Sequence, residues 1–80
     1  MTVDHLDPTP LYEQLAVVLR AMIQSGQLRP RDPLPSESQL QQEYGVSRGT
    51  IRKALDQMRA DGLVVTIAGR GTFVKPRLGE

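Results

Sequence analysis

The 80-residue sequence predicts an α+β domain of three helices followed by a small antiparallel β-hairpin. Three observations favour this fold class. Two short helical segments are separated only by residues 45–47, an amphipathic segment precedes them, and two β-branched segments joined by a glycine-containing turn follow them. One such domain accounts for residues 9–75, because a chain of this length can bury a single core but not two.

The net charge is only +1, but the basic residues are concentrated in the C-terminal half. Residues 1–44 carry three basic and six acidic side chains, whereas residues 45–80 carry seven basic and three acidic ones. A nucleic-acid partner would therefore contact the second half.

The absence of cysteine excludes disulfides and thiolate metal sites, and no apolar run or signal-peptide pattern predicts membrane insertion or export. We expect a cytoplasmic protein that does not bind membranes.

Residues 1–8 show no hydrophobic periodicity, so we expect a flexible N-terminal arm in which His5 is exposed. A metal site at His5 would need further ligands, and no spacing in the sequence supplies them. Thr9 followed by Pro10 predicts the start of the first helix, with threonine as the cap and proline at the first helical position. Gly26 should end this helix.

The first helix carries one broad apolar face, which predicts that it packs against a core. The residues that recur at helical spacing are Leu11, Leu15, Val18, Leu19, Met22 and Ile23. A helix lying on a membrane surface is the alternative reading of such a pattern. The polar face carries a single basic residue, however, so core packing is favoured.

Three prolines in residues 27–35 exclude a helix and predict an extended connector, with Leu34 in a short edge strand. The second helix should begin at Ser36, because Ser36 and Gln39 form the capping-box pattern. It should end near Tyr44, since the glycine that follows can adopt the left-handed conformation.

The third helix should be capped by Ser47 and end at Gly62, with Ile51, Leu55 and Met58 facing the core. Two short helices joined by a three-residue turn with glycine predict a helix-turn-helix, in which the second helix enters the major groove of DNA. We therefore assign six residues at the start of this helix to DNA binding: Ser47, Arg48, Gly49, Thr50, Arg52 and Lys53.

Within this set the expected roles differ. Arg48 lies in the first turn and should read a guanine edge, whereas Ser47 and Thr50 should contact phosphates. Arg52 is a second candidate for base reading. It could instead pair with Glu37, a carboxylate placed where the dipole of the second helix favours it.

Residues 63–67 and 72–74 are β-branched and apolar, and residues 68–71 between them are typical of a turn, which predicts a β-hairpin. Its tip carries Arg70 between glycines, so the backbone can approach another surface closely and the cation can enter a narrow minor groove. We assign Gly69 and Arg70 to DNA binding. The alternative, a solvated turn arginine, is less favoured beside a helix-turn-helix. Residues 76–80 should be a linker or a cut end.

Together these residues resemble the N-terminal domain of the GntR family of bacterial transcriptional regulators, a winged helix-turn-helix. The matching segments are PLY at 10–12, LPSE at 34–37, Leu40, VSR at 46–48, TIR at 50–52, AL at 54–55, GL at 62–63 and GTFV at 71–74.

Three positions depart from the family pattern. Arg31 replaces a usual glycine, Met58 replaces a common leucine, and Ser38 stands where many members carry an arginine that can read guanine. Ser38 is therefore a candidate DNA-binding residue with no base preference assigned.

The resemblance implies sequence-specific binding of double-stranded DNA as the operator-reading domain of a transcriptional regulator, with repression the expected outcome. It implies a palindromic operator and a homodimer, formed on DNA or through the larger effector-binding C-terminal domain that family members carry. The chain is either the DNA-binding part of a longer regulator or a minimal protein that dimerises by other means, and the sequence leaves both open. No cofactor is implied.

Other functional classes fit the sequence less well. The sole histidine lies in the arm, and the sequence has no nucleophile elbow, P-loop or paired metal ligands, so catalysis is not expected. A winged helix used for RNA or protein binding is the serious alternative, because fold alone does not determine function. Exposed aromatic residues would favour RNA, but Tyr12, Tyr44 and Phe73 lie where core or hairpin packing explains them.

Overall fold

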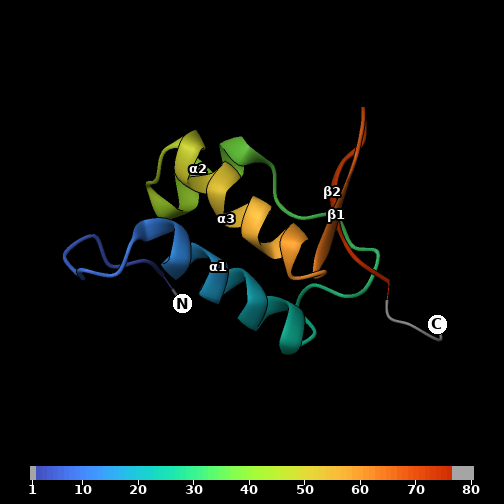
Figure 1. Cartoon of the computed structure of the whole chain (residues 1–80), viewed down its shortest axis with the longest axis horizontal. Coiled ribbons are helices and arrows are strands. Elements are labelled where there is room, and N and C mark those ends of the chain that lie inside the picture. Colours follow the sequence, from blue (N-terminus) through green and yellow to red (C-terminus); the bar gives the residue numbers. More distant parts are fainter. Residues whose placement is uncertain (1, 77–80) are drawn as a thin grey trace.

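The computed structural model describes residues 2–76. It contains, in chain order, α1 (Leu11–Gln24), α2 (Glu37–Tyr44), α3 (Arg48–Ala60), β1 (Val64–Ile67) and β2 (Gly71–Val74). The predicted α+β winged helix-turn-helix is therefore confirmed. Helix α3 packs on α1, and the hairpin extends from the end of α3 so that its turn points away from α1 (Figure 1). Residues 77–80, which belong to the expected linker or cut end, lie outside the described residues.

The start of α1 differs from the prediction. The cap position is Pro10, not Thr9, and no side chain caps the helix. The carbonyl oxygen of Pro10 accepts the first bonds of the helix, from Glu13 N at 3.0 Å and Gln14 N at 3.2 Å, so proline occupies the cap position. Gln14 Nε2 also donates to the carbonyl oxygen of Thr9 at 2.8 Å. The helix ends at Gln24, just before Gly26, whose φ of 87° matches the predicted stop.

The starts of α2 and α3 agree with the sequence because both are capped by local side chains. Ser36 Oγ accepts from Gln39 N at 3.1 Å, and Gln39 Oε1 accepts from Ser36 N at 2.9 Å, which completes the capping box. Ser47 caps α3 by accepting from Thr50 N at 3.1 Å. Helix α3 ends at Ala60, and Gly62 beyond its cap has a φ of 76°, which matches the predicted stop as Gly26 does for α1.

The core lies where the three helices meet. Its largest fully buried side chains are Leu15, Leu19, Leu40, Ile51 and Met58. Burial of such a side chain is worth about 1.5–3 kcal/mol, so this cluster carries much of the stability of a small domain. Met58, which replaces the leucine common in the family, is completely buried, and its unbranched side chain can adapt to the space available.

The hairpin is antiparallel, with Val64 opposite Val74 and Thr66 opposite Thr72. The connector pairs with the other edge of β2 through Leu34 N to Thr72 O at 2.9 Å and Val74 N to Asp32 O at 2.8 Å. The strand expected at Leu34 is thus reduced to backbone contacts around an isolated bridge between Pro33 and Phe73. Proline is tolerated at this edge because the bonds are made by its neighbours.

Residues 2–8 contact the folded domain, and the flexibility expected of this arm stays a prediction. Val3 is buried in the core cluster, and Asp4 N donates to Gln14 Oε1 at 2.7 Å. His5 is exposed, as expected, but its Nε2 lies 3.3 Å from the carbonyl oxygen of Tyr44 at the end of α2. Asp4 Oδ1 also accepts from Leu6 N at 2.9 Å. Such turns have no hydrophobic period, so the sequence pattern did not reveal them.

Candidate nucleic-acid interface

The turn between α2 and α3 is fixed at each of its three residues. Gly45 closes α2 with φ 65° and ψ 36°, a left-handed conformation that glycine adopts without a Cβ clash. Val46 is buried and anchors the turn to the core, and Ser47 caps the next helix. The two helices are therefore held rigidly, as a helix that must fit a groove requires.

Helix α3 buries one face and exposes the other. The buried side chains are Ile51, Ala54, Leu55 and Met58. The exposed face of its N-terminal half carries three cations, Arg48, Arg52 and Lys53, and its first turn has no acidic residue. Cationic side chains therefore stand beside the free backbone N–H groups at this helix end, where phosphate is attracted.

Helix α2 holds both arginines of this face through their Nε atoms. Arg48 Nε donates to Gln41 Oε1 at 3.2 Å, and Arg52 Nε donates to Glu37 Oε2 at 3.3 Å. The second contact confirms the pairing considered for Glu37 from the sequence. Within residues 2–76 the terminal nitrogens of these two arginines have no hydrogen-bond partner, so they remain available for a base edge or a phosphate.

Lys53 is held by α1. Its Nζ lies 4.2 Å from the centroid of the Tyr12 ring, which is a cation–π contact. The charge of the neighbouring Glu13, together with burial, raises the pKa of the Tyr12 hydroxyl, so this phenol is neutral at neutral pH. The sequence placed Tyr12 in the core and gave no sign that it orients a cation of α3.

The two hydroxyls expected at phosphates are not equivalent. Ser47 Oγ accepts from Thr50 N and donates to Thr50 Oγ1 at 3.0 Å, so its hydrogen is already used in the cap. The Thr50 hydroxyl accepts that bond and keeps its own hydrogen, which makes Thr50 the better donor to a phosphate. Gly49 is exposed in the first turn of α3, and Ser38 is exposed in the first turn of α2.

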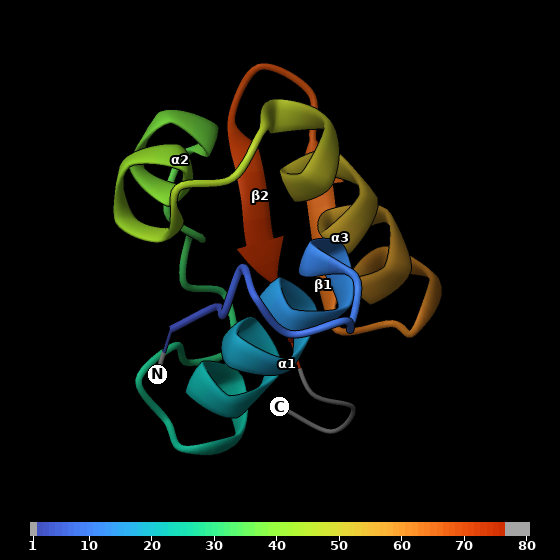
Figure 2. The same ribbon diagram turned by 90° about the vertical axis from the view of Figure 1, so that its left-hand side faces the viewer.

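The hairpin tip carries the other two residues assigned to DNA binding from the sequence, Gly69 and Arg70. Gly69 takes φ 77°, and Arg70 N donates to Ile67 O at 3.0 Å, which closes the turn. Arg70 lines a hollow together with Ser36 and Glu37, so the tip stands next to the first turn of α2. Figure 2 shows the hairpin turn and α2 at the same end of the molecule, with α1 at the other end.

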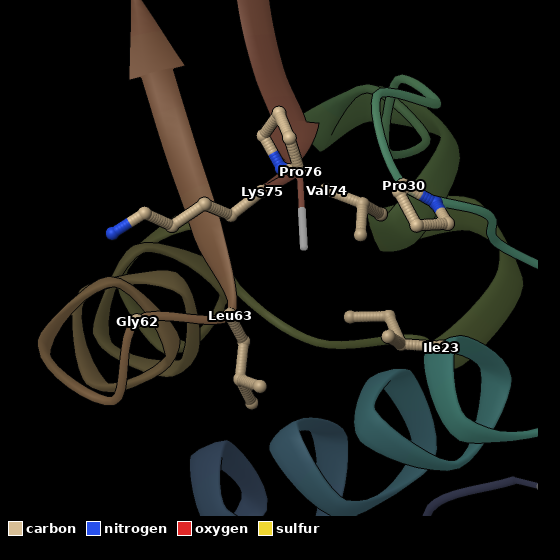
Figure 3. Close-up of a pocket in the computed structure, with 7 residues that line it drawn as sticks. All are labelled: Ile23, Pro30, Gly62, Leu63, Val74, Lys75 and Pro76. Atoms are coloured by element: carbon tan, nitrogen blue, oxygen red, sulfur yellow. The ribbon is translucent and has the colours of Figure 1, made fainter. Parts of the chain in front are cut away.

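Another groove lies at the opposite end of the molecule, beside the base of the hairpin. It has a volume of about 540 Å³ (Figure 3). Its lining residues are Ile23, Pro30, Gly62, Leu63, Val74, Lys75 and Pro76. Lys75 is the only titratable group in this lining, so no acid–base pair is present there. In residues 2–76 no cluster of three metal-ligating side chains occurs, and no helix has the length and hydrophobicity needed to span a membrane.

With this geometry in place, comparison with known proteins is direct. The family described as "Bacterial regulatory proteins, gntR family" matches residues 11–74. The chain belongs to the GntR family. Its similarity to curated members is high: it is 40% identical over its whole length to the transcriptional repressor NagR of Bacillus subtilis. It is 50% identical over 82% of its length to MngR of Escherichia coli, the repressor of a mannosyl-D-glycerate transport and metabolism system.

This GntR-family chain spans 33% of NagR and 28% of MngR, so it corresponds to about a third of these relatives. Among solved structures it is similar to the DNA-binding domain of AraR in complex with operator ORX1, with a TM-score of 0.83, 36% identity and coverage of 92% of both chains. It is also similar to YtrA from Sulfolobus acidocaldarius, a GntR-family transcription factor, with a TM-score of 0.85 and 32% identity. That match covers 96% of this chain and 81% of YtrA.

The structure places the sequence-derived residues at the start of α3 and at the hairpin tip, except for Ser38, which lies in the first turn of α2. Sequence reasoning missed the residues that hold these two regions in place, namely Gln41, Tyr12 and Arg59. Gln41 precedes Arg48 by seven residues, and only the angle between α2 and α3 makes the two side chains meet. No local pattern contains that information.

Proposed function

We propose that this chain binds double-stranded DNA sequence-specifically as the operator-reading domain of a transcriptional repressor. The observation that supports it most strongly is the exposed cationic half of α3, on a fold that matches the operator-bound domain of AraR over 92% of the chain. The printed roles of NagR and MngR as repressors support the regulatory part of the proposal. A role on the bacterial chromosome implies a cytoplasmic location.

In the proposed complex α3 enters the major groove. Arg48 uses its free terminal nitrogens to read a guanine edge, and Arg52, oriented by Glu37, lies one helical turn further along. Thr50 and Lys53 contact phosphates of the DNA, and Ser47, Gly49 and Ser38 lie beside the same sugar-phosphate backbone. Arg70 and Gly69 approach the adjacent minor groove, where the narrow groove favours a cation.

We further propose that two copies bind a palindromic operator as a two-fold dimer, with half-sites about one helical turn apart. The relatives NagR and MngR are about three times as long as this chain, so the domain would act as the DNA-binding part of such a regulator. The proposal is one of binding and not of catalysis, in line with relatives that are named transcription regulators.

The test begins with selection of bound duplexes from a randomised DNA pool by the 80-residue chain. Fluorescence anisotropy then compares the selected duplex with a scrambled duplex of equal length and with the same sequence as double-stranded RNA. We expect the selected DNA to bind at least about tenfold more tightly than either competitor, since each mismatched base pair costs about 1–3 kcal/mol. Equal binding of RNA would instead support the RNA-binding alternative, and lack of any enrichment would refute sequence-specific reading.

A further inference from the structure

A side-chain network connects the end of α3 to both strands of the hairpin. Arg59 Nη1 donates to Thr66 Oγ1 at 2.6 Å, and Thr66 Oγ1 lies 3.0 Å from Thr72 Oγ1. The other terminal nitrogen of Arg59 pairs with Asp56 on the same helix. One guanidinium therefore joins the recognition helix to β1 directly and to β2 through the two hydroxyls.

The network lies at the point where the hairpin leaves the core. Val64 and Val74 form a buried pair, and Thr66 and Thr72 are the next pair on the same face. One further pair closes the turn that carries Arg70. Arg59 thus contacts the hairpin between its buried base and its tip, about 7 Å along the strand from the turn.

The connector supports the hairpin in a different direction. Its backbone bonds, Leu34 N to Thr72 O and Val74 N to Asp32 O, lie in the plane of the sheet along the outer edge of β2. Bonds along one edge do not by themselves restrain rotation of the sheet about that edge, and the buried pair Val64 and Val74 restrains it at the core. Arg59 contacts the same face nearer the tip, where it adds a further restraint.

We propose that Arg59 is a positioning residue that, through Thr66, holds the hairpin at the angle at which Arg70 reaches DNA. This inference rests on the proposed DNA-binding function. Each terminal nitrogen of Arg59 already donates one bond, to Thr66 or to Asp56, which favours a positioning role over a phosphate contact. Because Arg59 acts through Arg70, replacing Arg59 should weaken DNA binding no more than removing Arg70 does. One phosphate contact strengthens DNA binding about fivefold at about 0.15 M salt, from a slope of log affinity against log salt of about 0.9 per contact.

The test is a double-mutant cycle between Thr66 and Arg70, measured by anisotropy on the duplex selected above. Thr66→Val removes the hydroxyl but keeps the shape and favours a strand, so the hairpin should remain folded. We expect it to weaken binding about two- to fivefold when Arg70 is present and to have no effect in the Arg70→Ala background. Thr66→Ser retains the hydroxyl and should restore wild-type affinity. Arg59→Met should reproduce the Thr66→Val result, and thermal melting checks that every variant is folded.

Three outcomes would overturn the positioning role: an equal loss for Thr66→Val in both backgrounds, no loss in either, or a loss for Thr66→Ser as large as for Thr66→Val. A loss for Arg59→Met that persists in Arg70→Ala would show direct contact with DNA and would overturn it as well. Failure of the wild-type chain to bind any duplex would refute the proposed function itself. The two failures are therefore distinguishable.

Discussion

Arg31 adopts a backbone conformation that suits glycine. Its φ of 74° makes it the one non-glycine residue with positive φ among residues 2–76. Left-handed backbone costs an L-residue about 1–2 kcal/mol, and this is offset by about 0.5–1 kcal/mol because glycine loses more conformational entropy on folding. The bond from Arg31 N to Val74 O at 2.8 Å survives any substitution that keeps the backbone N–H.

Arg31→Gly should therefore raise the free energy of unfolding by roughly 0.5–1 kcal/mol. Urea denaturation would show this as a higher midpoint at an unchanged m-value. Arg31→Ala is the matched control, because it removes the same charged side chain without relieving the backbone. A gain of equal size in both variants would attribute the effect to the side chain and contradict the backbone explanation.

Arg48 carries the second prediction at the residue scale. Its Nε is bonded to Gln41, which leaves the planar pair of terminal nitrogens for a guanine edge. Arg48→Ala should cost about 1–3 kcal/mol of binding free energy and relax the preference at one base pair. The measurement is affinity for a set of duplexes that differ at single positions of the selected site. Uniform weakening across the set would mean that Arg48 only contacts phosphate.

At the scale of elements, the sequence predicted those helix ends that nearby side chains cap, and it was less accurate where no side chain caps the helix. The caps at Ser36 and Ser47 were predictable, because each is made by side chains within three residues of the helix start. The pairing of Arg52 with Glu37 was also foreseen, since both positions follow from a helix-turn-helix. The start of α1 was predicted one residue too early, because the cap is the backbone carbonyl of Pro10 and no side chain marks it.

The hairpin should act as an electrostatic element. Arg70 stands on an exposed glycine-flanked tip that lacks the rigid surroundings needed to read a single base. Arg70→Ala should weaken binding to selected and scrambled duplexes alike and lower the slope of log affinity against log salt by about one unit. A modest preference for A-tract flanks should disappear with it, because a narrowed minor groove concentrates negative potential.

Titrations over a salt series, on selected duplexes with and without A-tract flanks, measure both the salt slope and the preference for A-tract flanks. Arg48→Ala is the comparison, because it should change sequence preference more than salt slope. An unchanged slope for Arg70→Ala would show that the tip does not touch DNA and that the hairpin is only structural.

At the scale of the whole molecule, the sequence predicted which elements exist but not how side chains on different elements meet. Two cations of α3 are contacted from other helices: Gln41 on α2 contacts Arg48, and Tyr12 on α1 contacts Lys53. The hairpin is contacted from α3, where Arg59 donates to Thr66. Each of these contacts depends on a tertiary angle set by the core. The docking of Val3 likewise depends on a surface formed only after the helices have packed.

The last prediction concerns assembly. A stable dimer interface buries about 800 Å² on each partner, which is about 15% of the 5370 Å² surface of this chain. The large exposed apolar side chains among residues 2–76 are Leu6, Val17, Val65 and Ile67. They are distributed over the docked N-terminal segment, α1 and β1, so they do not form one patch of that size. The 80-residue chain should therefore be mainly monomeric without DNA and should bind a single half-site weakly.

A palindromic duplex supplies the two-fold symmetry that the isolated chain lacks, so we expect two chains per palindrome, with half-site centres about 34–36 Å apart. Joining two copies through a dimerisation module should raise affinity for the palindrome by about 100-fold or more, because the second half-site is then bound at high effective concentration. Analytical ultracentrifugation with and without DNA, on palindromes and single half-sites, measures the oligomeric state of the free chain and the number of chains bound per duplex. A tight dimer of the free chain would contradict this picture, because the symmetry would then originate within the domain and joining the two copies would add little.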